Sequence, residues 1–170
     1  MSAWKQDKRW SDRFLPEIKS YLGLHLIGEP PIEEDAERNT DLMVLRMDAV
    51  RIGCRIRRNN YLARYSDGFT IRAGRPSGVK TELTKIIEGW GDYFFYGFSD
   101  SAESSLAAWA LADLRVFRVW LNRQILKTGK MPGDQRPNKD GSSHFIGFRW
   151  ADLPGEFVIA SVGLNKDMAA

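Results

Sequence analysis

An aspartate and a group of arginines stand close together in this sequence, and they could bind a metal ion and a phosphate. Asp41 opens one apolar run, and a second run follows that carries four arginines: Arg51, Arg55, Arg57 and Arg58. A carboxylate is a ligand that Mg²⁺ prefers, and a guanidinium group binds phosphate through paired N–H donors. The residue types therefore predict chemistry on a phosphate-bearing substrate.

The arginines belong to a longer basic stretch. Between residues 51 and 75 the chain also holds Arg64, Arg72 and Arg75, with Asp67 as its acidic residue, and Lys80 and Lys85 follow. The chain as a whole has a net charge of +3 and a pI near 9.1. A local excess of cations favours DNA or RNA as a partner. The alternative interpretation is a solvated surface whose arginines form weak ion pairs.

Three strands are expected to position these residues, at 41–46, 49–57 and 69–74. In the second one, apolar residues alternate with Arg51, Arg55 and Arg57, which is the period of a strand with one buried face. Met47 and Asp48 form a short connection, so the first two strands are expected to pair as an antiparallel hairpin. Helices are predicted over residues 12–24 and 79–91, and a strand over 92–98.

The C-terminal half is expected to be simpler. Asp100 and Glu103 have the spacing of a capping box, which predicts a long helix over residues 101–127. A polar loop over 128–143 and strands within 144–163 complete the chain. The whole sequence, 1–170, predicts a single α/β (α+β) domain in which helices flank a mixed sheet and residues 11–100 form the core.

The segment TDLMVL, followed by VRIGCRIRR and TELTKIIEGWGDYFFYGF, resembles the PD-(D/E)XK, or restriction-endonuclease-like, nuclease superfamily. In that family an Asp begins one core strand, and the neighbouring strand carries Glu-x-Lys. The resemblance implies a restriction-endonuclease-like fold and Mg²⁺-dependent hydrolysis of phosphodiesters. It assigns Asp41 to the metal and places Arg55-Ile56-Arg57 where Glu-x-Lys is expected, so that Arg57 would steady the phosphate.

The sequence departs from the family at the second metal ligand. Arg55 cannot replace a glutamate because a guanidinium does not bind Mg²⁺. The missing carboxylate would come from Glu17 on the first helix or from Glu37. A second register stays open, in which Asp48 opens the strand and Thr70-Ile71-Arg72 takes the Glu-x-Lys place.

Three functions remain open from the sequence. The chain could be a metal-dependent nuclease, a catalytically inactive relative that binds nucleic acid, or a phage or mobile-element accessory factor whose arginines meet an acidic protein partner. The apolar runs are too short for a membrane span, and the single cysteine, Cys54, fits a cytoplasmic location. Trp109 and Trp120 in the predicted long helix leave an oligomer open.

Overall fold

A computed structural model describes residues 3–28, 43–44, 50–138 and 140–164. The chain divides into two compact units, Met1–Ala49 and Val50–Ala170, and each is described by itself. The first unit holds α1 (Ala3–Asp12), α2 (Leu15–Leu26) and the short strands β1 (Ile27–Gly28) and β2 (Met43–Val44). The predicted first helix is confirmed as α2, and α1 before it was not predicted.

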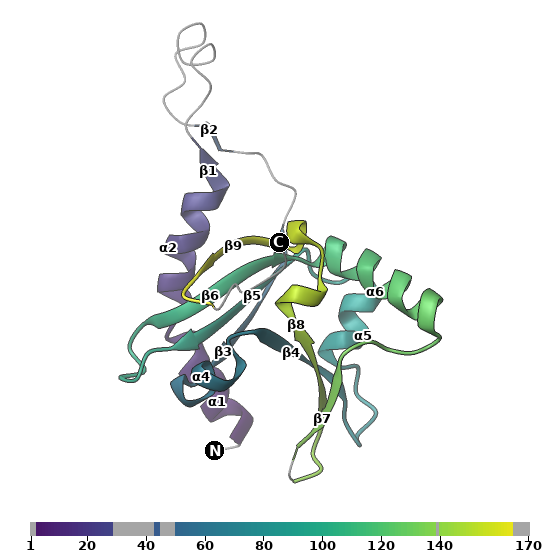
Figure 1. Cartoon of the computed structure of the whole chain (residues 1–170). Helices are drawn as coiled ribbons and strands as arrows, with labels where there is room; N and C mark the ends of the chain where they lie inside the picture. The colour runs from purple at the N-terminus through teal and green to yellow at the C-terminus, as the bar shows by residue number, and fades with distance from the viewer. Residues whose placement is uncertain (1–2, 29–42, 45–49, 139, 165–170) are drawn as a thin grey trace, which may run out of the picture. The chain divides into compact units, whose positions relative to one another are not determined.

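The second unit contains two sheets and the remaining helices (Figure 1). Its elements are β3 (Ile52–Arg57), η1 (Asn59–Tyr61), α4 (Leu62–Tyr65), β4 (Gly68–Gly74), α5 (Glu82–Ile87), β5 (Tyr93–Ser99), β6 (Leu106–Asp113), α6 (Leu114–Thr128), β7 (Asp134–Pro137), β8 (His144–Arg149), η2 (Trp150–Asp152), η3 (Gly155–Phe157) and β9 (Val158–Val162). The α+β class predicted from the sequence is therefore confirmed.

The four-stranded sheet has the order β3-β5-β6-β9 and is mixed, as predicted. β3 runs parallel to β5, whereas β5, β6 and β9 pair antiparallel. The three-stranded sheet has the order β4-β8-β7 and is antiparallel. The predicted strands at 49–57, 69–74 and 92–98 thus form β3, β4 and β5. The expected hairpin of the first two strands is wrong for the described residues: β2, the described part of the first strand, pairs with β1, and the second strand, β3, pairs with β5.

An aromatic core holds the two sheets and the helices of this unit together. Phe69 on β4 is 2% exposed, and its ring lies within about 6 Å of six other aromatic rings: those of Phe94, Tyr96, Phe117, Phe148, Trp150 and Phe157. α5 and α6, which lie side by side in Figure 1, add Leu83, Ile86 and Leu121 to the same cluster. Burial of this much apolar surface is the main stabilising contribution to the unit.

The long helix predicted over residues 101–127 is wrong in its first half. Residues 106–113 form the strand β6, and the helix α6 begins only at Leu114. Asp113 caps this helix because its carboxylate accepts a hydrogen bond from the backbone N–H of Arg115 at 2.7 Å. Gly129, with φ of 69°, ends the helix in the left-handed conformation.

Asp100 stabilises a turn between β5 and β6 instead of a helix. Its carboxylate accepts hydrogen bonds from the Ser104 N–H at 2.8 Å and from the Ser105 hydroxyl at 2.8 Å. These bonds lower the pKa of Asp100 to about 2, the Ser104 N–H having the largest effect. The sequence pattern of a capping box therefore marks a polar turn here.

The C-terminal strands are confirmed as β8 and β9, but the predicted loop at 128–143 contains a strand. Asp134–Pro137 forms β7, which pairs with β8 and places Arg136 opposite Phe145. None of the described helices combines the length and the apolar character needed to span a bilayer.

Candidate nucleic-acid interface

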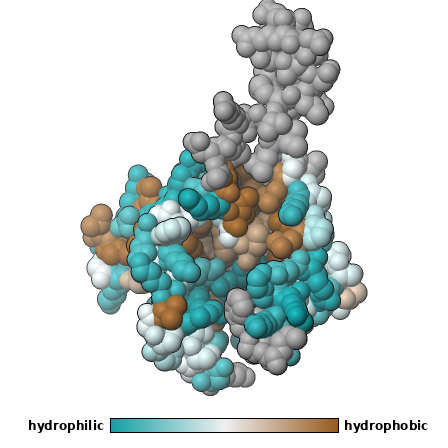
Figure 2. Space-filling model, turned by 180° about the vertical axis from the view of Figure 1, so that it is seen from behind, coloured by the Kyte–Doolittle hydropathy of each residue, from teal (hydrophilic) through white to brown (hydrophobic). Residues whose placement is uncertain are grey.

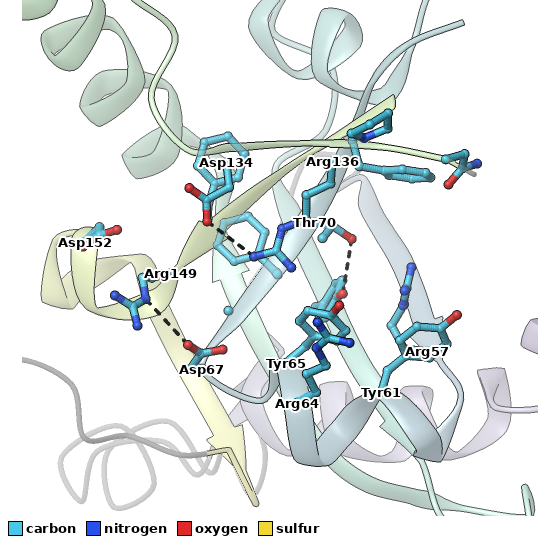
Figure 3. Close-up of a pocket in the computed structure, with 17 residues that line it drawn as sticks. Arg57, Tyr61, Arg64, Tyr65, Asp67, Thr70, Asp134, Arg136, Arg149 and Asp152 are labelled. Atoms are coloured by element: carbon cyan, nitrogen blue, oxygen red, sulfur yellow. Dashed lines mark hydrogen bonds and ion pairs between the residues drawn. The ribbon is translucent and has the colours of Figure 1, made fainter. Parts of the chain in front are cut away.

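The second unit contains a pocket of about 960 Å³ beside α4 (Figure 3). Its walls come from the end of β3, from η1 and α4, and from the three strands of the smaller sheet. Four arginines and three aspartates line it: Arg57, Arg64, Arg136 and Arg149, with Asp67, Asp134 and Asp152. The pocket is therefore strongly polar, with an excess of one positive charge.

Arg57 reaches the pocket because of the register of β3. In the parallel pairing, Arg55 lies opposite Tyr96 and Arg57 opposite Phe98. Residues paired in this way share one face of a sheet, and both aromatic partners belong to the core. The arginines of β3 therefore project from the core side of the sheet at its edge, where Arg57 lies 4.2 Å from the centroid of the Tyr61 ring. This distance fits a cation–π contact.

The short helix α4 contributes a second aromatic contact. Arg64 from α4 lies 5.3 Å, and Arg136 from β7 lies 5.1 Å, from the centroid of the Tyr65 ring. Tyr61 and Tyr65 are four residues apart, which places them on one side of this turn, and their ring centroids are 6.1 Å apart. Two tyrosines and three arginines thus meet at one wall of the pocket.

Gly147 on β8 leaves the space that Arg136 occupies. A Cβ at this position would lie 2.6 Å from the Nε atom of Arg136. Any larger residue would displace the guanidinium, since real Cβ contacts are essentially never that short. The absence of a side chain at Gly147 therefore helps to hold Arg136 against Tyr65.

The arginines of the pocket differ in their ion pairs. Arg136 lies 3.5 Å from Asp134, and Arg149 lies 3.6 Å from Asp67. Both pairs are largely exposed and contribute little to stability. Among the described residues, neither Arg57 nor Arg64 forms an ion pair. These two guanidinium groups are the ones available to an incoming anion.

A second arginine cluster adjoins the pocket at Phe145. Arg55 and Arg72 lie 5.3 Å and 5.2 Å from the centroid of this ring. Glu82 on α5 accepts a hydrogen bond from the Arg55 guanidinium and another from the backbone N–H of Arg72 at 3.1 Å. One carboxylate thus binds the guanidinium of Arg55 and the backbone of Arg72.

Arg72 is a partly buried member of this cluster. Burial, followed by the charges of Arg75 and Arg55, lowers the pKa of its guanidinium, which Glu82 partly opposes. The Nε atom of Arg72 is buried and has no hydrogen-bond partner. Arginine keeps its charge even when its pKa is lowered. Glu82 therefore supplies the negative charge that offsets the positive charges of Arg55 and Arg72.

The other predicted nucleic-acid-binding residues lie elsewhere in the unit. Arg51 lies 5.7 Å from the centroid of the Trp90 ring, and Arg58 pairs with Glu103 at 2.5 Å. Lys80 pairs with Glu88 at 2.7 Å. Two more are exposed, Arg75 after β4 and Lys85 on α5. Of the predicted nucleic-acid-binding residues, Arg57 therefore lines the pocket. Arg55 and Arg72 lie beside the pocket, and the remaining ones are not among its lining residues.

Of the three residues proposed to bind Mg²⁺, the structure describes Glu17. It lies on α2, where its carboxylate accepts a hydrogen bond from the Tyr21 hydroxyl at 3.0 Å. Asp41 and Glu37 lie outside the described residues, as does Asp48 of the alternative register. Within the described part of the chain, no three His, Cys, Asp or Glu side chains gather as metal ligands would.

Several residues of the pocket were not singled out from the sequence: Tyr61, Tyr65, Phe145, Arg136 and Arg149. The spacing of the two tyrosines in NNYLARY, directly after the arginine strand, is a local signal for the first two. Arg136 and Arg149 carry no such signal, because the pairing of β7, β8 and β4 brings them in from distant parts of the chain.

Comparisons with known proteins do not assign the chain to a family. No protein-family model, no curated protein and no solved structure matches it. The function is therefore inferred from the residues of the site.

Proposed function

We propose that this protein binds nucleic acid, DNA or RNA, in the pocket beside α4. The observation that carries the proposal is the pair Arg57 and Arg64, which have no carboxylate partner in the described part of the chain and lie against Tyr61 and Tyr65. Guanidinium groups bind phosphate oxygens, and aromatic rings offer a surface for bases. The two kinds of side chain together match the two parts of a nucleotide.

An acidic protein partner is the rival interpretation. The carboxylates of such a partner could bind the same arginines, but this binding would not require the tyrosine rings that lie beside them. Nucleic-acid binding accounts for both features, so it is the function that the site supports best.

The first experiment measures binding of fluorescein-labelled single-stranded and duplex oligonucleotides by anisotropy, in EDTA and over a range of salt. We expect binding that weakens as salt rises, because each neutralised phosphate releases counterions. The double variant R57Q/R64Q should weaken binding. The matched control is R123Q/K127Q, which removes the same charge from two exposed positions on α6 outside the pocket.

Equal loss of affinity in both double variants would show that net charge matters and the pocket does not. No binding to either oligonucleotide at low salt would contradict the proposal and favour an acidic protein partner.

Phosphodiester hydrolysis with Mg²⁺ stays a separate prediction, as do the restriction-endonuclease-like frame and the cytoplasmic location. A helix, α5, and a strand, β5, follow the arginine strand β3 along the chain, as the resemblance implies, but β4 belongs to the other sheet and does not pair with β3 as the alternative register would require. Incubation of plasmid DNA with the protein in Mg²⁺ or EDTA tests the activity. Cleavage that requires Mg²⁺ and is lost in Asp41→Ala would support it, whereas no cleavage in either condition would leave a binding protein.

A further inference from the structure

The wall formed by Tyr61 and Tyr65 has a consequence for the kind of nucleic acid that fits the pocket. Building on the proposed function, we propose that the pocket takes single-stranded nucleic acid and that its bases stack on these two tyrosines. The arginines alone would suit a single strand or a duplex. The aromatic rings favour the single strand, because its bases can stack on them.

The two tyrosines are accessible from the pocket that they line. Tyr61 is 37% exposed although Arg57 lies against its ring, so the residue keeps part of its surface open to solvent. Tyr65 is half-buried, with Arg64 and Arg136 within 5.3 Å of its ring centroid. Both rings line the pocket, as Figure 3 shows. A planar group entering the pocket therefore meets aromatic surface and guanidinium groups together.

Bases can stack on protein rings only where they are not stacked within a duplex. In a duplex, the faces of the bases are covered by their neighbours, and the grooves present only base edges. Stacking on protein rings requires bases that have left the helical stack, as in single strands, loops or ends. A site whose aromatic side chains lie within a concavity therefore suits a single strand better than a duplex.

The size and the charge of the pocket also suit nucleotides. The pocket volume of about 960 Å³ is at the upper end of the roughly 300–1,000 Å³ that small-molecule sites occupy. It has room for nucleotide-sized groups. Arg57 and Arg64 lie against the two tyrosines, and among the described residues they form no ion pair. Phosphates that flank a stacked base would thus find a cation beside each ring.

The test compares three labelled ligands on the full chain in EDTA: an oligothymidylate, an abasic strand of the same length, and a duplex of that length. The abasic strand keeps the phosphates and lacks the bases. We expect the oligothymidylate to bind roughly 5- to 150-fold more tightly than the abasic strand for each base that stacks, and more tightly than the duplex. Thymidine monophosphate should bind far more weakly than the strand.

The variants separate stacking from charge. Tyr61→Leu and Tyr65→Leu should lose most of the preference for thymidylate over the abasic strand, whereas Tyr61→Phe and Tyr65→Phe should keep it because the ring remains. Tyr61 is exposed, so its leucine variant is expected to fold, and a thermal melt checks each protein first.

The outcomes distinguish this inference from the proposed function. Equal affinity for the thymidylate and abasic strands, or tighter binding of the duplex, would overturn the single-strand inference while nucleic-acid binding survives. Thymidine monophosphate that binds as tightly as the strand would also overturn it, in favour of a mononucleotide site. No binding of any ligand would overturn the proposed function itself.

Discussion

Replacing Glu82 by glutamine should destabilise the second unit by more than the loss of an exposed ion pair would. The change removes the carboxylate that pairs with the Arg55 guanidinium and accepts a hydrogen bond from the backbone N–H of Arg72. Its negative charge also opposes the lowering of the pKa of the Arg72 guanidinium, which lies with Arg55 against the Phe145 ring. The side chains of Arg55 and Glu82 are 17% and 28% exposed. Exposed ion pairs contribute about 0–1 kcal/mol, and removal of one partner of a fully buried pair costs about 3–5 kcal/mol. We therefore expect Glu82→Gln to lower the free energy of unfolding by about 1–3 kcal/mol.

Glu88→Gln is the matched control, because it makes the same substitution just after the same helix. Glu88 pairs with Lys80, and the side chains are 36% and 64% exposed. Its loss should cost less than about 1 kcal/mol. Urea unfolding followed by both circular dichroism and tryptophan fluorescence measures the two variants and checks that the transition is two-state. In thermal melts, Glu82→Gln should lower Tm by about 3–9 °C. Equal costs for the two variants would refute the reasoning that the arginine cluster depends on Glu82.

Three further predictions test the binding site, the core and the β5–β6 turn. Arg57→Gln and Arg64→Gln should each reduce the slope of log K against log salt by about 0.7 for a single strand, because each removes about one phosphate contact; unchanged slopes in anisotropy titrations would contradict this. Phe69→Ala should lower the free energy of unfolding by about 3–5 kcal/mol in urea denaturation, because it opens a cavity among the aromatic rings; a loss below about 1 kcal/mol would contradict the central place of this ring. The pKa of Asp100 is about 2 in the folded protein, below the ordinary 3.8, so the folded state binds its proton less readily than the unfolded state. The stability that it contributes is therefore present above pH 3.8 and lost as the pH falls toward 2, and Asp100→Asn should remove this dependence in thermal melts across that range.

The strands with clear alternation could be predicted from the sequence, whereas the strand β6 was mistaken for the first half of a helix. β3 alternates arginine with apolar residues, and β5 is a short aromatic run, so both were predicted close to their observed bounds. β6 contains Ala108, Ala110 and Ala112, which pack on the core face of the sheet. Alanine is the strongest helix former, and the pattern around it also fits a helical period. Pairing with β5 decides in favour of the strand, and tertiary packing of this kind is not visible in local sequence.

The site could be predicted only in part. The basic strand and the resemblance to the nuclease superfamily both indicate Arg57, and the structure places it in the pocket. Arg136 was missed because it lay in a predicted loop, and its approach to Tyr65 depends on the pairing of β7 with β8. Contacts between residues so far apart in sequence are set by sheet register, which the local pattern does not determine.

The most direct test of the central claim is a titration of the ¹⁵N-labelled protein with an oligothymidylate, followed by NMR of the backbone amides and the arginine Nε–H groups. Nucleic acid bound in the pocket should shift the signals of Tyr61, Arg64 and Arg136 first and leave those of the exposed Leu126 on α6 unchanged. Shifts that gather on α6, or none at the pocket while the ligand binds, would contradict the account.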